Sequence, residues 1–466
     1  MAEKKNTILF VVPDGVGARN YLFSKLPRLL SEEVQLSFLT TLTKPAIAEV
    51  EELHDIAINY LHFDLPAEPK KAKMYREAAV YARLLHNAEV LENETILQNW
   101  NKKKASFTKK IFYGIVERMG KWASKQYERI LTLEKKAANA WSLKRVFQYE
   151  KTLTEIRPKA IFITHQRVAS LLPICLAAKK LNIPVISCIY SWDNTPKASL
   201  AINADTYTVW SEYMKAELQL LHPELKEEQI VVTGTPQFEF YKDKSRYISR
   251  DEFALTYGLD ASRKWICFSG DDEITSPYDP RYLEDVAKAL MAFPEESRPQ
   301  LIFRRAPVDV SGRYDKVLAS YAEDIVSIAP IWTTDTKNWG AIYPKNADID
   351  LLVNTAKHCD LVINLGSTMA HDFAMFDTPC LYVAYDVEED TNWSVTTIYA
   401  FQHFRSMENL EAVGWVKAPS EWHHKITLAL EDPKSIGPER VDWLKRIVNH
   451  PVTKASENIA NLLLSK

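Results

Sequence analysis

The chain has 466 residues, of which 46% are hydrophobic and 26% charged, a balance that is typical of globular proteins and excludes a disordered chain. Its formal net charge of -3 excludes recruitment of nucleic acid by an overall positive field. The length favours two domains, and no apolar run reaches the ~20 residues that a membrane-spanning helix requires.

The first elements predict a doubly wound sheet. Residues 8–12 form a continuous apolar run, typical of a strand buried on both faces of a parallel sheet. A loop over 13–17, a helix that continues to Leu30 and a second strand over 36–39 follow. Strand, glycine loop, helix and strand in this order are the opening unit of a doubly wound fold.

A first domain is expected over residues 1–240. Its segment 68–156 loses the strand pattern and is predicted to be a helical insertion, rich in Lys, Glu and aromatic residues. The pattern then returns, with strands expected at 160–164, 185–190, 206–210 and 230–232 and a helix at 171–181.

A second domain is expected over residues 241–438. Strands are predicted at 265–268, 301–303, 325–328, 360–364 and 380–383, and helices at 283–291, 350–358 and 369–376. Residues 439–466 read as a single C-terminal helix. Alternation of strands and helices in both halves predicts an α/β protein in which two Rossmann-like domains face each other across a cleft.

The cysteines and the start of the chain indicate where the protein works. Five cysteines occur without any C-x-x-C pair, and we expect buried, reduced thiols rather than a metal or redox site: Cys175, Cys188, Cys267, Cys359 and Cys380. The charged start runs into a strand without the apolar core of a signal peptide, so a cytoplasmic protein is expected.

A glycine turn near the end of the second domain is the most informative motif. Gly366, Ser367 and Thr368 follow a buried strand and precede a helix, and Asp372 lies about one turn into that helix. Glycine permits close approach of a ligand, and free amides at a helix start bind anions. The turn would then hold a diphosphate while Asp372 accepts ribose hydrogen bonds. The alternative is a small-residue turn with an ordinary first-turn carboxylate.

This segment resembles the donor-binding half of GT-B glycosyltransferases and of the similar glycerophosphotransferases. These families place a glycine or serine turn, a helix with an acidic residue and a "Pro-x-hydrophobic" strand in this order, here with Pro379 before the strand. Gly234 and Thr235 belong to a stretch, 231–237, that resembles the "TG-x-P" element between the domains. The resemblance implies a GT-B fold, with Gly234 and Thr235 among the donor contacts.

Two further segments at strand ends of the second domain are candidates for the donor site. In the resembled families the loop with Ser269 and Gly270 faces the donor phosphates. An acidic surface turn over 271–273 is the alternative, and no convincing metal motif occurs. Arg304 and Arg305 follow the next strand, where arginine can bind phosphate through two hydrogen bonds. An exposed basic pair is the other interpretation.

The loop after the first strand is expected to face an acceptor through Gly15, Gly17 and Arg19. Several GT-B families carry a histidine base here, but this chain has Arg19, which stays protonated and cannot act as a base. Asp14 is therefore the first candidate for the catalytic base. Asp193 is the second.

Asp193 belongs to a polar cluster that follows a buried strand, the position at which open α/β sheets bind ligands. We expect Trp192 to stack on a sugar and Asn194 and Lys197 to contact the acceptor. A capped loop with a packed Trp192 is the alternative. His165 follows the neighbouring strand and is either an acceptor-binding or basic residue or a histidine at a helix start.

Residues 100–131 combine an apolar stripe with a basic face. The basic residues are Lys102, Lys103, Lys104, Lys109, Lys110, Arg118, Lys121, Lys125 and Arg129. Such a helix can lie in an anionic membrane interface. Packing of the stripe on the domain core, with the lysines in water, is the other interpretation.

Together these features predict a glycosyltransferase that moves a sugar from a nucleotide-sugar to a lipid-linked or cell-surface glycan acceptor. The nucleotide-sugar is a co-substrate; no cofactor, metal or nucleic acid is expected. Three alternatives stay open, namely a CDP-glycerol-type glycerophosphotransferase, a sugar-nucleotide epimerase and a non-catalytic, membrane-docked assembly subunit of the same fold.

Overall fold

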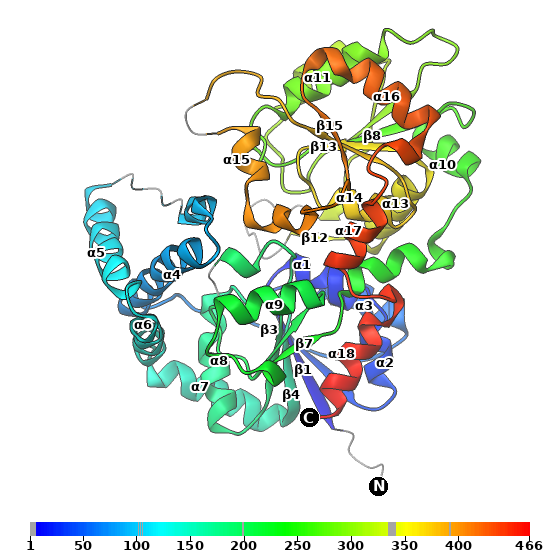
Figure 1. Ribbon diagram of the computed structural model, residues 1–466. Coiled ribbons are helices and arrows are strands. Elements are labelled where there is room, and N and C mark those ends of the chain that lie inside the picture. The colour runs from blue at the N-terminus through cyan, green and yellow to red at the C-terminus, as the bar shows by residue number, and fades with distance from the viewer. Residues whose placement is uncertain are drawn as a thin grey trace.

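The computed structural model describes residues 6–100, 102, 104, 106–197, 200–333, 342–390 and 393–466. Two parallel sheets, each surrounded by helices, form two domains that lie one above the other in Figure 1. The first sheet takes its strands from residues 7–232 and the second from residues 265–416. The two Rossmann-like domains predicted from the sequence are confirmed.

The first sheet is entirely parallel. Its strands, in spatial order, are β3 (Ile58–His62), β2 (Gln35–Thr40), β1 (Thr7–Val12), β4 (Pro158–Ile163), β5 (Val185–Cys188), β6 (Thr206–Val209) and β7 (Ile230–Val232). All six residues of β1 are buried, because the strand lies inside the sheet with helices on both faces. The Phe10 ring contacts Phe38 of β2 and Phe162 of β4 at centroid distances of 5.0 and 5.4 Å.

Short helices connect these strands. They are α1 (Gly15–Gly17), a π-helical turn (Ala18–Leu22), α2 (Leu26–Ser31), α3 (Lys44–His54), α8 (Leu172–Lys180) and α9 (Glu212–Leu221). The prediction of one helix up to Leu30 is wrong. Ser24 accepts a hydrogen bond from the Leu26 amide and donates one to the Tyr21 carbonyl, which turns the chain, and Pro27 then begins a new helix.

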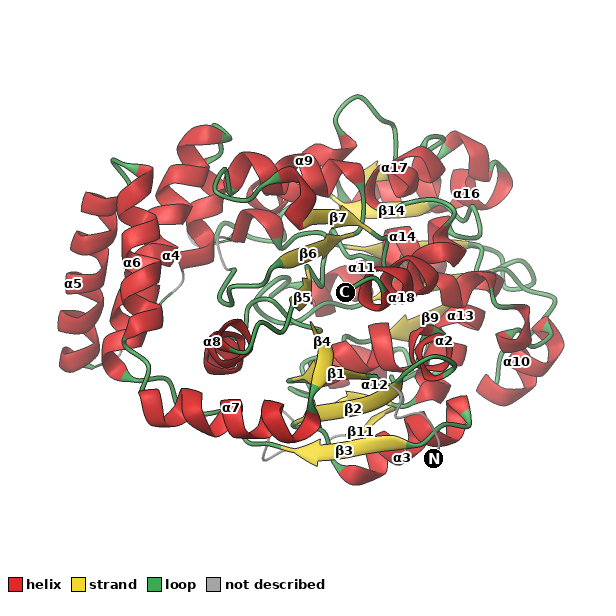
Figure 2. Cartoon of the chain, turned by 90° about the horizontal axis from the view of Figure 1, so that it is seen from below, coloured by secondary structure: helices red, strands yellow, loops and turns green. Residues whose placement is uncertain are grey.

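The segment predicted as a helical insertion folds into α4 (Lys70–Val90), the 3₁₀ helix η2 (Glu94–Trp100), α5 (Phe107–Ala123), α6 (Tyr127–Asn139) and α7 (Leu143–Ile156). Figure 2 shows α4, α5 and α6 as a group beside the first sheet. The buried Arg83 guanidinium of α4 binds Glu134 of α6 at 2.5 Å and Glu224 after α9 at 2.7 Å. This ion-pair network ties the insertion to the first domain.

The second sheet is also parallel, in the order β10 (Ile325–Ser327), β9 (Gln300–Arg304), β8 (Trp265–Ser269), β13 (Leu361–Asn364), β14 (Cys380–Val383) and β15 (Gly414–Val416). Its helices are α10 (Arg250–Tyr257), α11 (Asp279–Leu290), α12 (Asp315–Ser320), α13 (Asn346–His358), α14 (Met369–Ala374), α15 (Val395–Tyr399) and α16 (Trp422–Glu431). A two-stranded antiparallel ribbon, β11 (Trp332–Thr333) with β12 (Tyr343–Pro344), reaches the first domain.

The C-terminal segment consists of two helices, α17 (Arg440–Ile447) and α18 (Ala455–Leu464), so the prediction of a single helix over 439–466 is wrong. Pro451 interrupts it, because proline lacks an amide donor and disfavours a helical conformation in the preceding residue. Helix α18 packs on α2 of the first domain and on the 3₁₀ helix Pro236–Lys242, where the Ser456 amide and hydroxyl both donate to Glu239 at 2.7 Å. The chain therefore ends on the domain in which it begins (Figure 1).

The five cysteines are buried free thiols, as predicted. Within the described ranges, no helix has the length and apolar character needed to cross a membrane. The same residues contain no group of three His, Cys, Asp or Glu side chains arranged to hold a metal ion.

Candidate functional site

The candidate site is a cleft between the two domains, at the carboxyl ends of strands of both sheets. It consists of two hollows, which we name the Trp192 hollow and the Arg304 hollow after residues in their walls; they enclose about 500 and 260 Å³. Ser191, Asp271, Ser367 and Thr368 line both. Because open α/β sheets bind ligands at this edge, the two hollows are the candidate substrate-binding site.

Arg304 is held at the end of β9 by an ion pair in the wall of its hollow. The residue is only 5% exposed, and its Nη2 donates to Asp348 of α13 at 2.8 Å. Asp348 also accepts from the Ile331 amide and the Trp332 indole, at 2.8 and 2.9 Å. Burial alone would raise the pKa of Asp348, but the guanidinium and these hydrogen bonds lower it. Nη1 of Arg304 has no hydrogen-bond partner among the described residues.

Asp372 of α14 presents an unsatisfied acceptor to the same hollow. It is 4% exposed, and its Oδ1 has no hydrogen-bond partner in the described part of the chain. Burial raises the pKa of this carboxyl, an effect that Arg19, the nearby Tyr241 hydroxyl and Arg304 partly oppose. Native proteins leave few buried polar atoms unpaired. The Tyr241 hydroxyl, which also has no other partner among the described residues, lies beside the same carboxyl and can share it with a ligand. A buried donor, Arg304 Nη1, and a buried acceptor in one hollow favour a ligand that binds both.

Two further arginines bring positive charge to this hollow. Arg19 comes from the π-helical turn after β1, and Arg305 follows β9. Neither forms an ion pair with a carboxylate of the described residues, although Arg305 donates to the Asp309 carbonyl at 2.5 Å. Arginine binds phosphate through paired hydrogen bonds. The expected role of Arg19 in acceptor binding thus competes with a role beside the donor.

The turn at 366–368 lies at the junction of the two hollows. Gly366 has φ +72°, and a Cβ atom there would lie 2.7 Å from the Phe404 ring, so both backbone and packing require glycine. The amides are less free than predicted, since Ser367 donates to Asn364 Oδ1 at 2.8 Å. Helix α14 has only six residues, which limits the field at its start.

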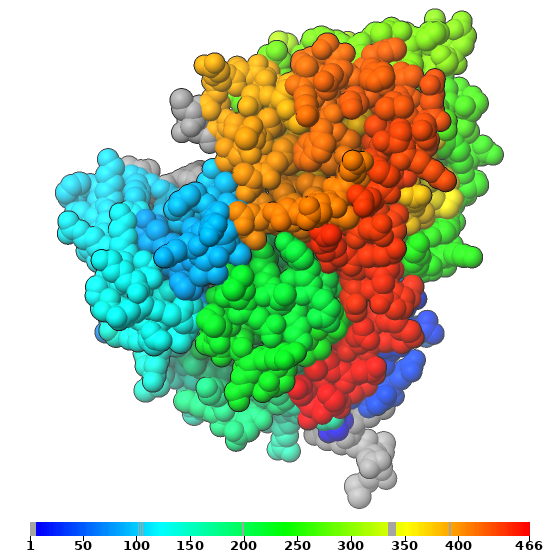
Figure 3. Space-filling view, viewed as in Figure 1, coloured from blue at the N-terminus to red at the C-terminus, as the bar shows by residue number. Residues whose placement is uncertain are grey.

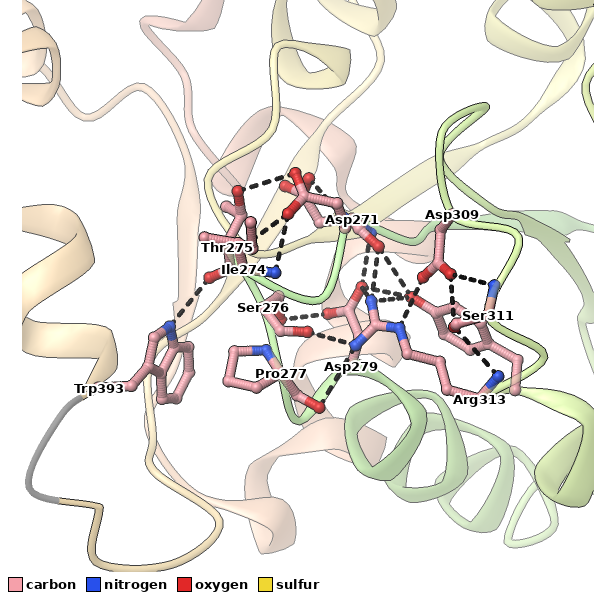
Figure 4. A network of polar contacts seen from close by, with 12 residues as sticks. Asp271, Ile274, Thr275, Ser276, Pro277, Asp279, Asp309, Ser311, Arg313 and Trp393 are labelled. Carbon is pink, nitrogen blue, oxygen red and sulfur yellow. Dashed lines mark hydrogen bonds and ion pairs between the residues drawn. The ribbon is translucent and has the colours of Figure 1, made fainter. Parts of the chain in front are cut away.

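The loop after β8 is rigidly held beside this turn. Gly270 packs against Tyr314, whose hydroxyl would lie 2.7 Å from a Cβ atom at this position. Figure 4 shows Arg313 binding the loop from below: it donates to the Asp271 and Ser276 carbonyls at 2.6 Å and to Asp309 at 2.6 Å. Much of the predicted acidic turn is therefore bonded within the second domain.

Asp271 is the acidic residue of this loop that faces the cleft, where it lines both hollows. Its amide donates at 2.6 Å to the buried Asp279, which also accepts from Ser276 and Tyr314 (Figure 4). Burial and the Asp279 carboxylate raise the pKa of Asp271 to about 7. A carboxyl group with this pKa can both take up and release a proton at neutral pH. The sequence predicted no separate role for Asp271, which was considered only as part of the acidic turn over 271–273.

Trp192 joins the two domains. Its indole donates to Thr368 Oγ1 at 3.0 Å, and its ring packs against His371, His403 and Trp443 at centroid distances of 5.0, 4.6 and 5.9 Å. The side chain is only 4% exposed, so its faces are covered by protein. Trp192 still lines the hollow named after it, but packing against the second domain leaves little of its ring open, and stacking on a sugar stays a prediction.

Asp193 is paired, which makes it a weak base. It accepts hydrogen bonds from Ser191 and Asn194, at 2.6 and 2.8 Å, and forms an ion pair with Lys197. Burial would raise the pKa of Asp193, but Lys197 and the hydrogen bonds outweigh it and hold this pKa far below its usual range. Asn194 is buried and bridges to Gln166. Asp193 and Lys197 still line the Trp192 hollow.

The helical insertion and a 3₁₀ helix of the second domain wall the Trp192 hollow, a feature that the sequence did not indicate. Asn93 donates to the Ala400 carbonyl and Gln402 Oε1, both at 3.1 Å, which joins the insertion to η9 (Gln402–Met407). In Figure 3 the blue insertion meets the orange segment of the second domain. The neighbouring His403 lines the hollow, and burial lowers its pKa to about 4, so the imidazole is neutral.

Asp14 and His165 form a hydrogen-bonded pair. Asp14 Oδ2 lies 2.5 Å from His165 Nδ1, and Asp14 Oδ1 accepts from the Gly17 amide at 3.3 Å as the cap of α1. Both oxygens of this proposed base are therefore occupied. The centroids of the His165 and Tyr190 rings lie 4.1 Å apart. Tyr190 lines the Arg304 hollow, whereas His165 does not. Asp14 lines neither hollow, and its contacts fit a residue that orients His165.

The glycines of the first loop serve packing. A Cβ atom at Gly15 would overlap the Ile342 carbonyl oxygen of the second domain, and one at Gly17 would overlap Thr164 Oγ1. Protein backbone and side chains, not an acceptor, approach here, which corrects the predicted role of both residues.

The segment resembling "TG-x-P" also lies outside the hollows. Gly234 has φ +78° and faces Ala455 of α18, 3.2 Å from a Cβ placed on it, and Thr235 is fully buried. Neither lines the cleft, so the expected donor contact is wrong. The glycine permits close packing of the returning C-terminal helix.

Comparison with known proteins places the fold. No family model and no curated protein matches the chain. Solved structures do: UDP-GlcNAc 2-epimerase from Methanocaldococcus jannaschii (11% identity, TM-score 0.53), UDP-GlcNAc 2-epimerase from Neisseria meningitidis bound to UDP-GlcNAc (10%, 0.50) and HepE from Anabaena in complex with UDP and glucose (11%, 0.51). Each match covers 99% of this chain and 100% of the other. The chain therefore has the GT-B fold.

Proposed function

We propose that the chain is an enzyme that binds a nucleotide-sugar in the Arg304 hollow and transfers its sugar to an acceptor in the Trp192 hollow. The observation that carries the proposal is the pair of unpartnered buried atoms, Arg304 Nη1 and Asp372 Oδ1. A nucleotide supplies both partners: ribose hydroxyls donate to the carboxylate, and carbonyl or phosphate oxygens accept from the guanidinium.

The diphosphate of such a donor belongs at the junction of the hollows, where Ser367 and Thr368 lie and Arg19 and Arg305 bring unpaired positive charge. This position directs the sugar into the Trp192 hollow. The compared structures of the same fold include complexes with UDP and with UDP-GlcNAc, which supports a nucleotide-sugar as the ligand class.

The reaction forms a bond between an acceptor hydroxyl oxygen and the anomeric carbon and breaks the bond from that carbon to the phosphate oxygen. The diphosphate leaves with the electron pair, and Arg19 and Arg305 stabilise its charge, so the proposal includes no metal. The acceptor proton passes to a base. We assign this role to Asp271, which lines both hollows and whose pKa of about 7 suits proton transfer at neutral pH.

The acceptor we propose is a glycan, lipid-linked or on a growing surface polysaccharide. The Trp192 hollow, at about 500 Å³, has room for a sugar unit beside the donor sugar. Its wall includes the Asp193–Lys197 pair and the neutral His403, polar groups that can orient hydroxyls.

A second candidate is a nucleotide-sugar epimerase. Two of the compared structures are UDP-GlcNAc 2-epimerases, and an acid–base group such as Asp271 beside the donor sugar also suits proton transfer at a sugar carbon. The two reactions differ in their need for an acceptor.

Thermal unfolding with UDP-, GDP-, CDP- and dTDP-linked donors, including CDP-glycerol, tests donor binding first. We expect one nucleotide series to raise the unfolding temperature; no shift with any of them would refute the proposal. Incubation with the stabilising donor then separates the candidates. An epimerase changes the sugar without acceptor, a transferase releases nucleoside diphosphate only when a glycan acceptor is added, and an assembly subunit does neither.

A further inference from the structure

The outer face of α5 exposes large apolar side chains in a regular row. Phe107, Ile111 and Ile115 follow one another at four-residue spacing, and Trp122 comes seven residues later on the same face. They are 77%, 50%, 47% and 53% exposed. The opposite face of the helix, with Val116 and Ala123, is buried against α4 and α6. The exposed side chains of this row are therefore not needed for the packing of the insertion.

Basic residues surround this row, and we call the two sets together the α5 face. Lys110, Arg118 and Lys125 each lie three residues beyond a member of the row, and Lys121 directly precedes Trp122. None of these four forms an ion pair with a described carboxylate, whereas Lys102 and Lys104, also in the predicted basic segment, are paired with Glu77 and Glu117. Lys103 lies outside the described residues.

The charge of this region contrasts with that of the chain. Between Ser106 and Arg129 there are six basic and two acidic residues, so the region carries +4 while the whole chain carries -3. Arg129 lies 4.5 Å from the Trp122 ring. An apolar row with a tryptophan, flanked by unpaired cations, is the arrangement of helices that lie in a lipid interface.

The geometry points to an anionic membrane surface as the occupant of the α5 face. The apolar row enters the boundary between headgroups and acyl chains, and the lysines and Arg118 bind anionic headgroups. A second copy of the chain fits less well, because a twofold interface would bring the same positive faces together. Figure 1 shows α5 at the outer edge of the insertion, away from both sheets, where a flat surface can reach it.

Docking in this way would attach the membrane to the same insertion that lines the cleft. The 3₁₀ helix η2, which precedes α5, contributes Thr95, Gln98 and Asn99 to the Trp192 hollow. The insertion thus forms a link between the membrane and the acceptor side. The docking proposal depends on the α5 face alone and holds whatever donor the enzyme uses.

Co-sedimentation of the full chain with vesicles tests the proposal. Vesicles of phosphatidylcholine with phosphatidylglycerol should bind the protein, those of phosphatidylcholine alone should bind it weakly, and added salt should weaken the binding. In a variant with Phe107→Ser, Ile111→Ser and Ile115→Ser, the partition coefficient should fall at least about tenfold, because burial of even one such side chain in the interface is worth roughly that factor. Lys110→Glu with Lys121→Glu should abolish the preference for anionic lipid.

The control is Leu255→Ser, which removes an apolar side chain that is 87% exposed on α10 of the second domain and should leave binding unchanged. Thermal unfolding and light scattering without lipid check the fold and the oligomeric state. The proposal is overturned if the protein ignores anionic vesicles, or if the α5 variants bind like the original chain. Dissociation of a dimer by the serine variant would instead assign the face to a contact between copies.

Discussion

Replacement of Asp372 by Asn should stabilise the free protein and weaken ligand binding at the same time. Asp372 is buried, and its Oδ1 has no partner among the described residues. Leaving such a charged acceptor unpaired costs about 1–3 kcal/mol. Asparagine has the same shape without the charge, so we expect a gain of about 1 kcal/mol in the free energy of unfolding, or about 1–3 °C in a chain of this size.

The gain should depend on pH. Burial raises the folded-state pKa of Asp372 above its unfolded value. For an acid, this means that the folded state binds the proton more tightly, so stability is lost as the pH rises from the unfolded pKa through the folded one. Asp372→Asn removes this loss. The variant should equal the original chain at acidic pH and exceed it at neutral pH.

Binding should change in the opposite direction. Hydrogen bonds to a charged group contribute about 1.5–3 kcal/mol, so affinity for the stabilising nucleotide should fall about tenfold to a hundredfold. Isothermal titration with the nucleoside diphosphate measures this loss, and thermal unfolding without ligand measures the stability. Asp251→Asn, at an exposed site on α10, is the matched control and should change neither. A variant that is less stable, or that binds nucleotide as tightly as the original chain, would refute the reasoning.

Other predictions follow from the same contacts. Gly366→Ala should cost about 1–2 kcal/mol more than Gly258→Ala, because both have positive φ but only Gly366 has an aromatic ring against it; denaturant unfolding compares the two. Asp271→Asn should remove the ionisation near pH 7 from the pH profile of kcat/KM, and it should remove the loss of stability that the raised pKa produces between about pH 4 and 7. An unchanged pH profile would exclude Asp271 as the base. Trp192→Phe should cost about 1 kcal/mol less in a chain that already carries Thr368→Val than in the original chain, because the hydrogen bond to Thr368 is then already absent and only the loss of ring packing remains.

The strands of the fold could be predicted where burial covers both of their faces. β1 and β13 are continuous apolar runs because helices cover the sheet on each side. β3 and β15 were missed. β3 lies at a sheet edge with only Ile58 fully buried, and β15 has three residues, so neither leaves a long apolar run in the sequence.

The sequence predicted which residues line the candidate site better than it predicted the partners of their side chains. Arg304 lines the cleft because it ends β9, and Asp372 lines it because its helix follows the end of β13 at the same edge of the sheet. What each side chain does depends on partners far away in the chain. Asp348 takes one side of the guanidinium and leaves the other free, and this choice has no signature in the sequence.

The roles of glycines and histidines were the hardest to predict from the sequence. A glycine in a loop indicates that another group approaches the backbone closely, but the sequence does not identify that group. At Gly15 the group is the Ile342 carbonyl. His403 lies in a short 3₁₀ helix without periodicity, so nothing in the pattern places it in the Trp192 hollow. The contact between His165 and Asp14 joins two loops 151 residues apart in the chain, so no local pattern indicates it.

A crystal structure with a bound nucleoside diphosphate tests the central claim most directly. We predict density for the ribose within hydrogen-bond distance of Asp372 Oδ1, an oxygen of the nucleotide on Arg304 Nη1, and the diphosphate between Ser367 and Arg19. Nucleotide density in another part of the chain, or both buried atoms still without partners in the saturated complex, would contradict the account.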